Sequence, residues 1–230
     1  CSGIALDAQV ATETTMSLWA TYLAGCDLVV HSAGWLEGGL TASYEKLALD
    51  LEILRMFERL REEARASGGE VHLLLGNHEL MNAAGDLTYV TRGGFAQFAN
   101  TPPHPSHEAD VLRAPQLAHG RLRAFLPGGP FAVRLATYGL TYRSADAIFV
   151  HGGILPQHLR ELERMESESQ AWLRDQRRTP TDLALHPDSP LWTRRYSISP
   201  GARACAEVAR TLDAEGLSRM VVAHTVQDDG

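Results

Sequence analysis

The chain has 230 residues, of which 44% are hydrophobic and 21% charged, a composition typical of an ordinary soluble globular protein with a full core. Its net charge of −7 at pH 7 argues against a general nucleic-acid binder and against a protein that binds anionic membranes. No apolar run approaches the roughly 20 residues of a membrane-spanning helix, and three cysteines without metal-ligand spacing argue against a disulfide framework.

The two ends of the chain do not look like natural boundaries. It opens at Cys1 without a methionine and stops at Gly230, directly after a motif-like string. Residues 1–20 contain no basic segment ahead of an apolar stretch, so they do not predict a signal peptide. We therefore interpret the chain either as a piece of a longer protein, cut short at both ends, or as a divergent one. We expect a location inside the cell, with cytoplasm and plastid both open.

The first third of the sequence predicts a strand, a loop, a helix and a second strand. Residues 28–30 are a short apolar run, and the glycines of residues 33–39 indicate a loop. Residues 41–66 predict a helix, because leucines recur at three- to four-residue steps with Glu and Arg between them. Residues 67–69, Ser-Gly-Gly, have the composition of a helix end, and residues 71–75 predict the next strand.

In the rest of the chain, predicted strands again alternate with predicted helices and loops. Proline and glycine clusters within residues 100–130 predict an inserted loop or cap over the sheet. Residues 147–150 and 220–223 are strand-like, whereas residues 157–178 predict a polar helix and residues 202–214 an amphipathic one. Strands that alternate with helices predict an α/β fold. We take residues 1–230 as a single domain that carries the insertion.

Ligand-type residues directly follow three of the predicted strands. They are Asn77 and His78 after the first, His151 after the second and His224 after the third. In an open α/β sheet, ligands bind just beyond the carboxyl ends of the strands. An amide oxygen and imidazoles that converge there suit a divalent metal. Each position alone is explained as well by a polar loop or a turn-capping histidine, but the three together favour a metal site.

Glycines accompany these residues. Gly76 allows a tight turn at the end of a strand, and we expect Gly152 and Gly153 to let the backbone approach a ligand closely.

The strings around these residues resemble motifs of a known superfamily. Gly76-Asn77-His78-Glu79, His151-Gly152-Gly153 and Ala223-His224-Thr225 are similar to the third, fourth and fifth motifs of the calcineurin-like metallophosphoesterases. The ending, residues 223–230, resembles the phosphoprotein phosphatase branch, and residues 189–194 with Met81-Asn82 resemble its Shewanella-like group. The resemblance extends from about residue 25 to the end. It implies a two-sheet β-sandwich flanked by helices, in four αββα layers.

The resemblance also implies roles for individual residues. Asn77, His151 and His224 would bind the second of two metal ions, and His78 would protonate the leaving oxygen. Arg194 or Arg195 would hold a phosphate oxygen. The ions, Mn²⁺ with Zn²⁺ or Fe as alternatives, would activate a hydroxide that attacks phosphorus. The substrate would be a phosphorylated protein or a small phosphoester, with no nucleic-acid or membrane partner.

The sequence departs from the family in its first two motifs. A Gly-Asp-x-His motif is missing; the nearest candidate, Asp7, has Gln9 where the histidine belongs. In the second motif, Gly34 stands where the metal-bridging aspartate is expected. Glu37 replaces the aspartate that orients the catalytic histidine, and Gly38 replaces a phosphate-binding arginine. The residues present therefore support one metal ion instead of two.

Three hypotheses follow. The chain is a metal-dependent phosphomonoester hydrolase of the Shewanella-like group, a pseudophosphatase that binds phosphorylated partners, or a nucleotide or diadenosine-polyphosphate hydrolase. Gly34 and the missing first motif favour the pseudophosphatase, whereas residues 190–192 and 226–230 favour the protein phosphatase over the nucleotide hydrolase.

Overall fold

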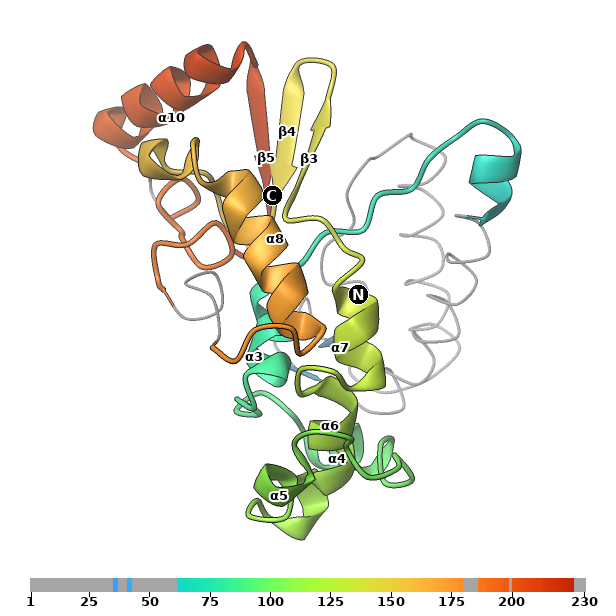
Figure 1. Ribbon diagram of the computed structural model, residues 1–230. Coiled ribbons are helices and arrows are strands. Elements are labelled where there is room, and N and C mark those ends of the chain that lie inside the picture. The colour runs from blue at the N-terminus through green and yellow to red at the C-terminus, as the bar shows by residue number, and fades with distance from the viewer. Residues whose placement is uncertain (1–34, 37–40, 43–61, 180–185, 199, 226–230) are drawn as a thin grey trace. The chain divides into compact units, whose positions relative to one another are not determined.

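The computed structural model describes residues 35–36, 41–42, 62–179, 186–198 and 200–225 (Figure 1). The chain divides into two compact units. One comprises Cys1–His72 and Val90–Gly94, and the other Leu73–Tyr89 and Phe95–Gly230. The described part of the chain has no helix that is both long enough and apolar enough to pass through a membrane.

The first unit differs from prediction near residue 40. Strand β1 (Trp35–Leu36) pairs antiparallel with β2 (Thr41–Ala42), where a loop and the start of a helix were predicted. Helical structure is present at residues 62–66, and Gly68 follows with a φ of 85°, as a helix end requires. The remainder of the predicted helix and the predicted strand at 28–30 lie outside the described residues.

A three-stranded mixed sheet forms one end of the second unit. Strand β3 (Thr141–Ser144) pairs antiparallel with β4 (Ala147–Val150), which pairs parallel with β5 (Arg219–Val222). All four residues of the central strand β4 are buried. Figure 1 shows the three strands side by side, in the order β3-β4-β5. The predicted strands near residues 150 and 222 are thus confirmed, within a mixed α/β fold.

The strand predicted at residues 71–75 is reduced to one bridge. Leu74 pairs in parallel with Gly139, through hydrogen bonds from the Leu75 amide to the Gly139 carbonyl (2.8 Å) and from the Gly139 amide to the Leu73 carbonyl (2.9 Å). Helix α3 (Asn77–Ala83) begins directly afterwards. The apolar run is therefore an extended lead into α3, and it ends close to the sheet.

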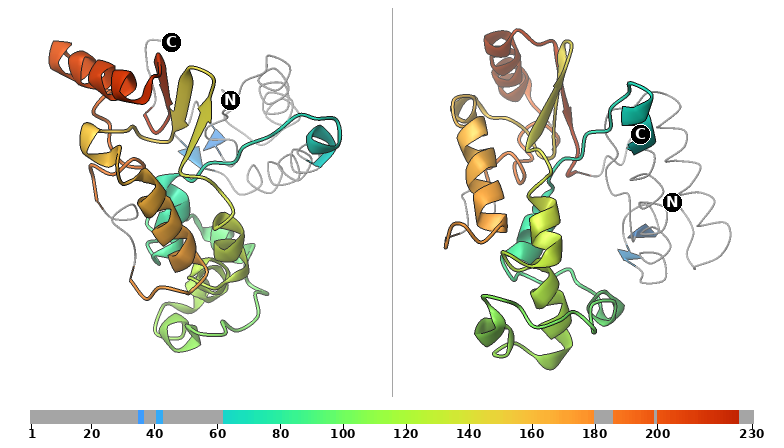
Figure 2. Two further views of the ribbon diagram at one scale, coloured as in Figure 1. Left: turned by 45° about the horizontal axis from the view of Figure 1, so that its top comes forward. Right: turned by 45° about the vertical axis from the view of Figure 1, so that its right-hand side comes forward.

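The segment predicted as a loop is mostly helical. It contains α5 (Glu108–Val111), the 3₁₀ turn η2 (Gln116–Ala118), α6 (His119–Phe125) and α7 (Pro130–Leu135), and α4 (Arg92–Ala96) precedes it. The second proline and glycine cluster marks a helix start, because Gly129 is the N-cap of α7 and Pro130 its first residue. In both views of Figure 2, α5 and α6 lie on the side of α3 away from the sheet.

Both predicted C-terminal helices are present, the first shorter than predicted and the second with nearly its predicted bounds. The polar helix starts as the 3₁₀ turn η3 (Pro156–His158) and continues as α8 (Leu162–Leu173). It ends before residue 178, because Asp175 takes a left-handed φ of 59°. Helix α10 (Ala202–Glu215) was predicted to within one residue, and Gly216 ends it with a φ of 64°.

The main hydrophobic core joins α7 and α8 to α3 and to the extended segment before it. Leu75 and Leu80 are fully buried together with Leu140, Leu173 and Leu191, and Trp172 packs in the same cluster. Burial of a leucine side chain contributes about 1.5–3 kcal/mol relative to its exposed state. The core thus fixes the position of the loop that precedes α3, where Asn77 is found.

Candidate metal and phosphate site

The sheet brings two of the predicted ligands to one edge. Strands β4 and β5 run parallel with Val150 opposite Val222, so His151 and Ala223 leave the sheet at the same level. The Ala223 amide donates to the His151 carbonyl at 2.8 Å, which extends this pairing by one step. His224 then takes a left-handed φ of 61°, an uncommon conformation for a residue other than glycine. Such strain is frequent where a side chain has to be aimed at a functional site.

Three predicted ligand atoms converge at this edge. His151 Nε2 lies 2.8 Å from Asn77 Oδ1 and 3.1 Å from His224 Nδ1, and the two imidazole centroids are 4.9 Å apart. Asn77 and His224 are buried, with 4% and 8% of their surfaces exposed. Residues separated by more than 70 positions therefore meet at one point, where three polar atoms lie close together.

Two of the three separations between these atoms are compatible with ligands that share one divalent ion. Ligand atoms about 2.1 Å from a shared ion lie roughly 3–3.4 Å from each other in octahedral or tetrahedral geometry. The two separations around His151 Nε2 are close to these values. One amide oxygen and two imidazole nitrogens are ligands that Mn²⁺, Zn²⁺ and Fe²⁺ accept. The described residues contain no group of three or more His, Cys, Asp or Glu side chains placed to bind a metal, so this set lacks a carboxylate.

Gly76 lets two neighbours of Asn77 approach closely. The Glu79 carboxylate accepts a hydrogen bond from the Gly76 amide at 3.0 Å. A Cβ atom on Gly76 would lie 2.5 Å from Glu79 Oε2 and 3.3 Å from the His151 ring. Sequence analysis did not single out Glu79, although a Glu at the third position of a helix is a known capping signal.

The glycines after His151 lie against the backbone of a neighbouring segment. The Gly152 and Gly153 amides both donate to the Pro190 carbonyl, at 2.7 and 3.1 Å. A Cβ on Gly152 would lie 2.9 Å from the Pro190 and Thr193 carbonyl oxygens. Gly152 and Gly153 thus approach the backbone of residues 190–193 closely, and their predicted approach to a ligand stays a prediction. This contact holds the segment that carries Arg194 against the site.

His78 projects from the first turn of α3, next to Asn77. Burial lowers the pKa of its imidazole, and the nearby Arg194 guanidinium lowers it further, while Asp86 acts in the opposite direction. Its ring stacks on Tyr89, with centroids 5.1 Å apart and an angle of 16° between the planes. Sequence analysis did not find Tyr89, because a single aromatic residue in a loop carries no periodic signal.

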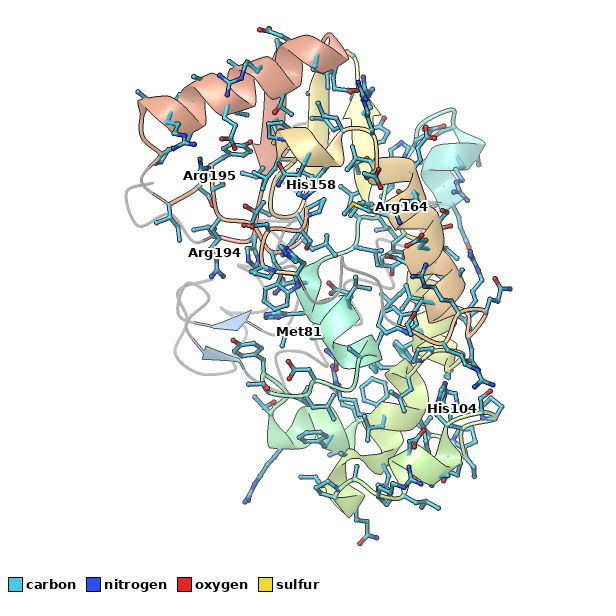
Figure 3. All side chains as sticks on the ribbon, turned by 60° about the vertical axis from the view of Figure 1, so that its left-hand side comes forward. Met81, His104, His158, Arg164, Arg194 and Arg195 are labelled. Carbon is cyan, nitrogen blue, oxygen red and sulfur yellow. The ribbon has the colours of Figure 1, made fainter. Side chains whose placement is uncertain are left out.

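The two predicted phosphate-binding arginines are in different environments. Arg194 donates to the His224 carbonyl at 3.4 Å and lies near His78. Arg195 instead forms a 3.1 Å ion pair with Glu207 on α10. Figure 3 shows both on one loop, with Arg195 toward α10. Arg194 is therefore next to the predicted ligands, whereas Arg195 is bound to a helix.

The edge of the site also includes Trp192, which sequence analysis placed only within a motif. Its indole meets the His224 ring edge-on at a centroid distance of 5.9 Å. Glu37, Gly34, Gly38 and Asp7 lie outside the described residues, so their predicted roles stay predictions.

Comparison with known proteins gives similarities to two different families, and the two matches overlap. Residues 1–73 match a family model described as trimethylamine methyltransferase (MTTB), which is less than half of the chain. Over 212 aligned residues the chain is 30% identical to Shewanella-like protein phosphatase 2 of Arabidopsis thaliana, covering 79% of this chain and 54% of that protein. It is 28% identical to uncharacterized protein R398 of Acanthamoeba polyphaga mimivirus, covering 74% of this chain and 75% of that protein.

A solved structure supports the fold. The crystal structure of a cold-active protein-tyrosine phosphatase from a psychrophilic Shewanella species matches with a TM-score of 0.54 at 23% identity. The match covers 78% of this chain and 51% of that one. This chain thus spans about half the length of the Arabidopsis and Shewanella proteins.

Proposed function

We propose that the chain, which is similar to Shewanella-like protein phosphatase 2, belongs with the calcineurin-like metallophosphoesterases and hydrolyses phosphomonoesters with the help of a divalent metal. The convergence of Asn77, His151 and His224 at the edge of the sheet carries this proposal. We further propose that the three-stranded sheet belongs to one half of the two-sheet sandwich expected from the family.

In this proposal Asn77, His151 and His224 hold one ion, with Mn²⁺ the first choice and Zn²⁺ or Fe as alternatives. When bound, such an ion activates water and offsets the negative charge of the phosphoryl oxygens. The neutral ligand set leaves the charge of the ion uncompensated by the protein. Anionic phosphate would supply the missing negative charge, so binding of the ion and of the substrate should support each other.

The side chains next to this ligand set carry the remaining steps. Arg194 binds a phosphoryl oxygen, because its guanidinium lies beside both His224 and His78. His78 in its protonated form donates a proton to the oxygen of the leaving group, which departs as an alcohol or a phenol. Trp192 packs against the edge of the His224 ring and limits its rotation.

Hydrolysis of phenyl phosphate in the presence of Mn²⁺ tests the proposal. His78→Ala should lower kcat about 10²- to 10⁴-fold, the contribution of a general acid. His186→Ala, which changes an exposed histidine elsewhere in the chain, should leave kcat unchanged. Equal turnover by the wild-type protein and the His78→Ala variant would argue against the proposed role of His78.

A phosphate-binding protein without turnover is the second candidate. The observation in its favour is the match of residues 1–73 to a different family, over the part of the chain where the first two phosphatase motifs would be expected. Without the bridging carboxylate, a second ion is not held and the nucleophile is poorly activated. This candidate predicts that inorganic phosphate binds in the presence of Mn²⁺, and that the wild-type protein shows no hydrolysis above the His78→Ala background.

A further inference from the structure

An exposed aromatic ring lies on the histidine proposed as the proton donor. Tyr89 stacks on the imidazole of His78, yet 63% of the tyrosine is exposed to solvent. A large aromatic residue with so much exposed surface gains little from burial. The loop that carries Tyr89 therefore holds its ring against His78.

The loop before Tyr89 is anchored at two points. The Asp86 carboxylate accepts hydrogen bonds from the Thr88 amide at 3.0 Å and from the Thr88 hydroxyl at 2.5 Å. Leu87 packs against the buried cluster of Val111 and its neighbours. Tyr89 is thus presented from a turn that is fixed by its own hydrogen bonds and by an apolar contact.

The backbone of His78 is fixed independently. The Asn82 side chain donates to the His78 carbonyl at 2.8 Å and accepts from Arg121 Nε at 2.7 Å. The Arg121 guanidinium in turn lies over the rings of Phe98 and Phe125, 5.1 and 4.6 Å from their centroids. These contacts fix the position of the His78 backbone. They do not set the rotation of its ring, for which the terminal torsion is intrinsically broad.

We propose that Tyr89 is a positioning residue, which holds the plane of the His78 imidazole in the orientation for proton donation to the leaving oxygen. The inference rests on the proposed function. A proton donor works only when its N–H points at the accepting oxygen, and a parallel ring stacked on one face prevents the imidazole from turning out of that plane. Tyr89 itself needs no contact with the substrate.

Leaving groups of different acidity separate this role from a structural one. Phenolate leaves slowly unless it is protonated, whereas the nitro group of p-nitrophenolate stabilises the anion and makes protonation less important. Tyr89→Leu should lower kcat for phenyl phosphate about threefold to tenfold, the effect of a stacked aromatic pair. It should leave kcat for p-nitrophenyl phosphate and both KM values nearly unchanged.

Two further variants complete the kinetic test. Tyr89→Phe keeps the ring and should behave as the wild-type protein with both substrates. Leu112→Ala removes another exposed apolar side chain, 60% exposed at the C-cap of α5, and should have no effect. An equal loss with both substrates, a change confined to KM, or no change in Tyr89→Leu would overturn the inference.

A measurement without turnover distinguishes this inference from the proposed function. In proton NMR spectra, the ring of Tyr89 should shift the His78 carbon-bound ring protons, and Tyr89→Leu should abolish that shift while Tyr89→Phe preserves it. Unchanged His78 signals in Tyr89→Leu would refute the stacking role even if the protein is an active phosphatase. Absence of wild-type hydrolysis together with the expected shift would refute the phosphatase proposal and the role in proton donation, and would leave only the stacking contact established.

Discussion

His151 is the residue on which the arrangement of the site depends. Its Nε2 atom lies within hydrogen-bond distance of both Asn77 and His224, and its position follows directly from the buried strand β4. The sequence was sufficient to place His151 and His224 together, because each follows a strand and parallel strands end at one edge. Asn77 joins them from the end of an extended segment that forms only one bridge. The sequence could not separate Arg194 from Arg195. The ion pair between Arg195 and Glu207, which distinguishes them, joins residues in different elements.

Gly76→Ala should weaken the site through Glu79. The backbone at Gly76 is extended, with φ −110° and ψ 171°, so alanine fits the conformation, but its Cβ would displace the Glu79 carboxylate. The loss of that charge-assisted hydrogen bond should lower the free energy of unfolding by about 1–2 kcal/mol. Urea denaturation measures this change.

Gly69→Ala is the matched control for that variant, because its new Cβ would make only ordinary contacts of 3.6 Å. An equal effect of the two substitutions would mean that the position of Glu79 does not matter.

At the level of elements, long and strongly patterned segments were predicted well and short ones were not. Helix α10 was predicted almost to the residue, because its apolar positions recur over several turns. Helices α5 and α6 were missed, since elements of 4 and 7 residues are too short for a helical period to be visible. The predicted strand at 71–75 failed for another reason. Its partner is the single residue Gly139, far along the chain.

The turn between β3 and β4 is joined to the start of β5 by a pH-dependent contact. Asp146 accepts from Arg219 at 2.7 Å and from the Ser218 hydroxyl, and these hydrogen bonds lower the pKa of its carboxyl group from 3.8 to about 2. Because the folded-state pKa is the lower one, this contribution to stability is present above pH 3.8 and is lost as the pH falls through about 2.

Asp146→Asn should therefore destabilise the protein slightly at pH 6 and reduce the loss of stability between pH 4 and pH 2. The effect should be small because the pair is exposed to solvent. Denaturation midpoints measured across this range provide the test, with the exposed Asp213→Asn as control. A steeper acid-induced loss in Asp146→Asn than in the wild-type protein would contradict the sign of the shift.

At the scale of the whole molecule, two similarities overlap: the match to the Arabidopsis phosphatase covers 79% of the chain, and residues 1–73 also match the model of another family. The match to residues 1–73 ends next to the boundary between the two compact units, at His72 and Leu73. The interpretation of Gly34 and Glu37 as altered phosphatase motifs assumed one family along the whole chain. If residues 1–73 instead derive from the second family, those two positions are not replacements at all, and the missing ligands were never part of this segment.

Both interpretations predict one metal ion per chain. A measurement of the metal stoichiometry therefore tests the proposed site most directly. The wild-type protein, stripped of metal and titrated with Mn²⁺ in a calorimeter, should bind one ion per chain, because the described residues supply one set of ligands at Asn77, His151 and His224. His151→Ala should abolish this binding, whereas His186→Ala should not. Two ions per chain, or one ion still bound by the His151→Ala variant, would contradict a single metal site at the ends of these strands.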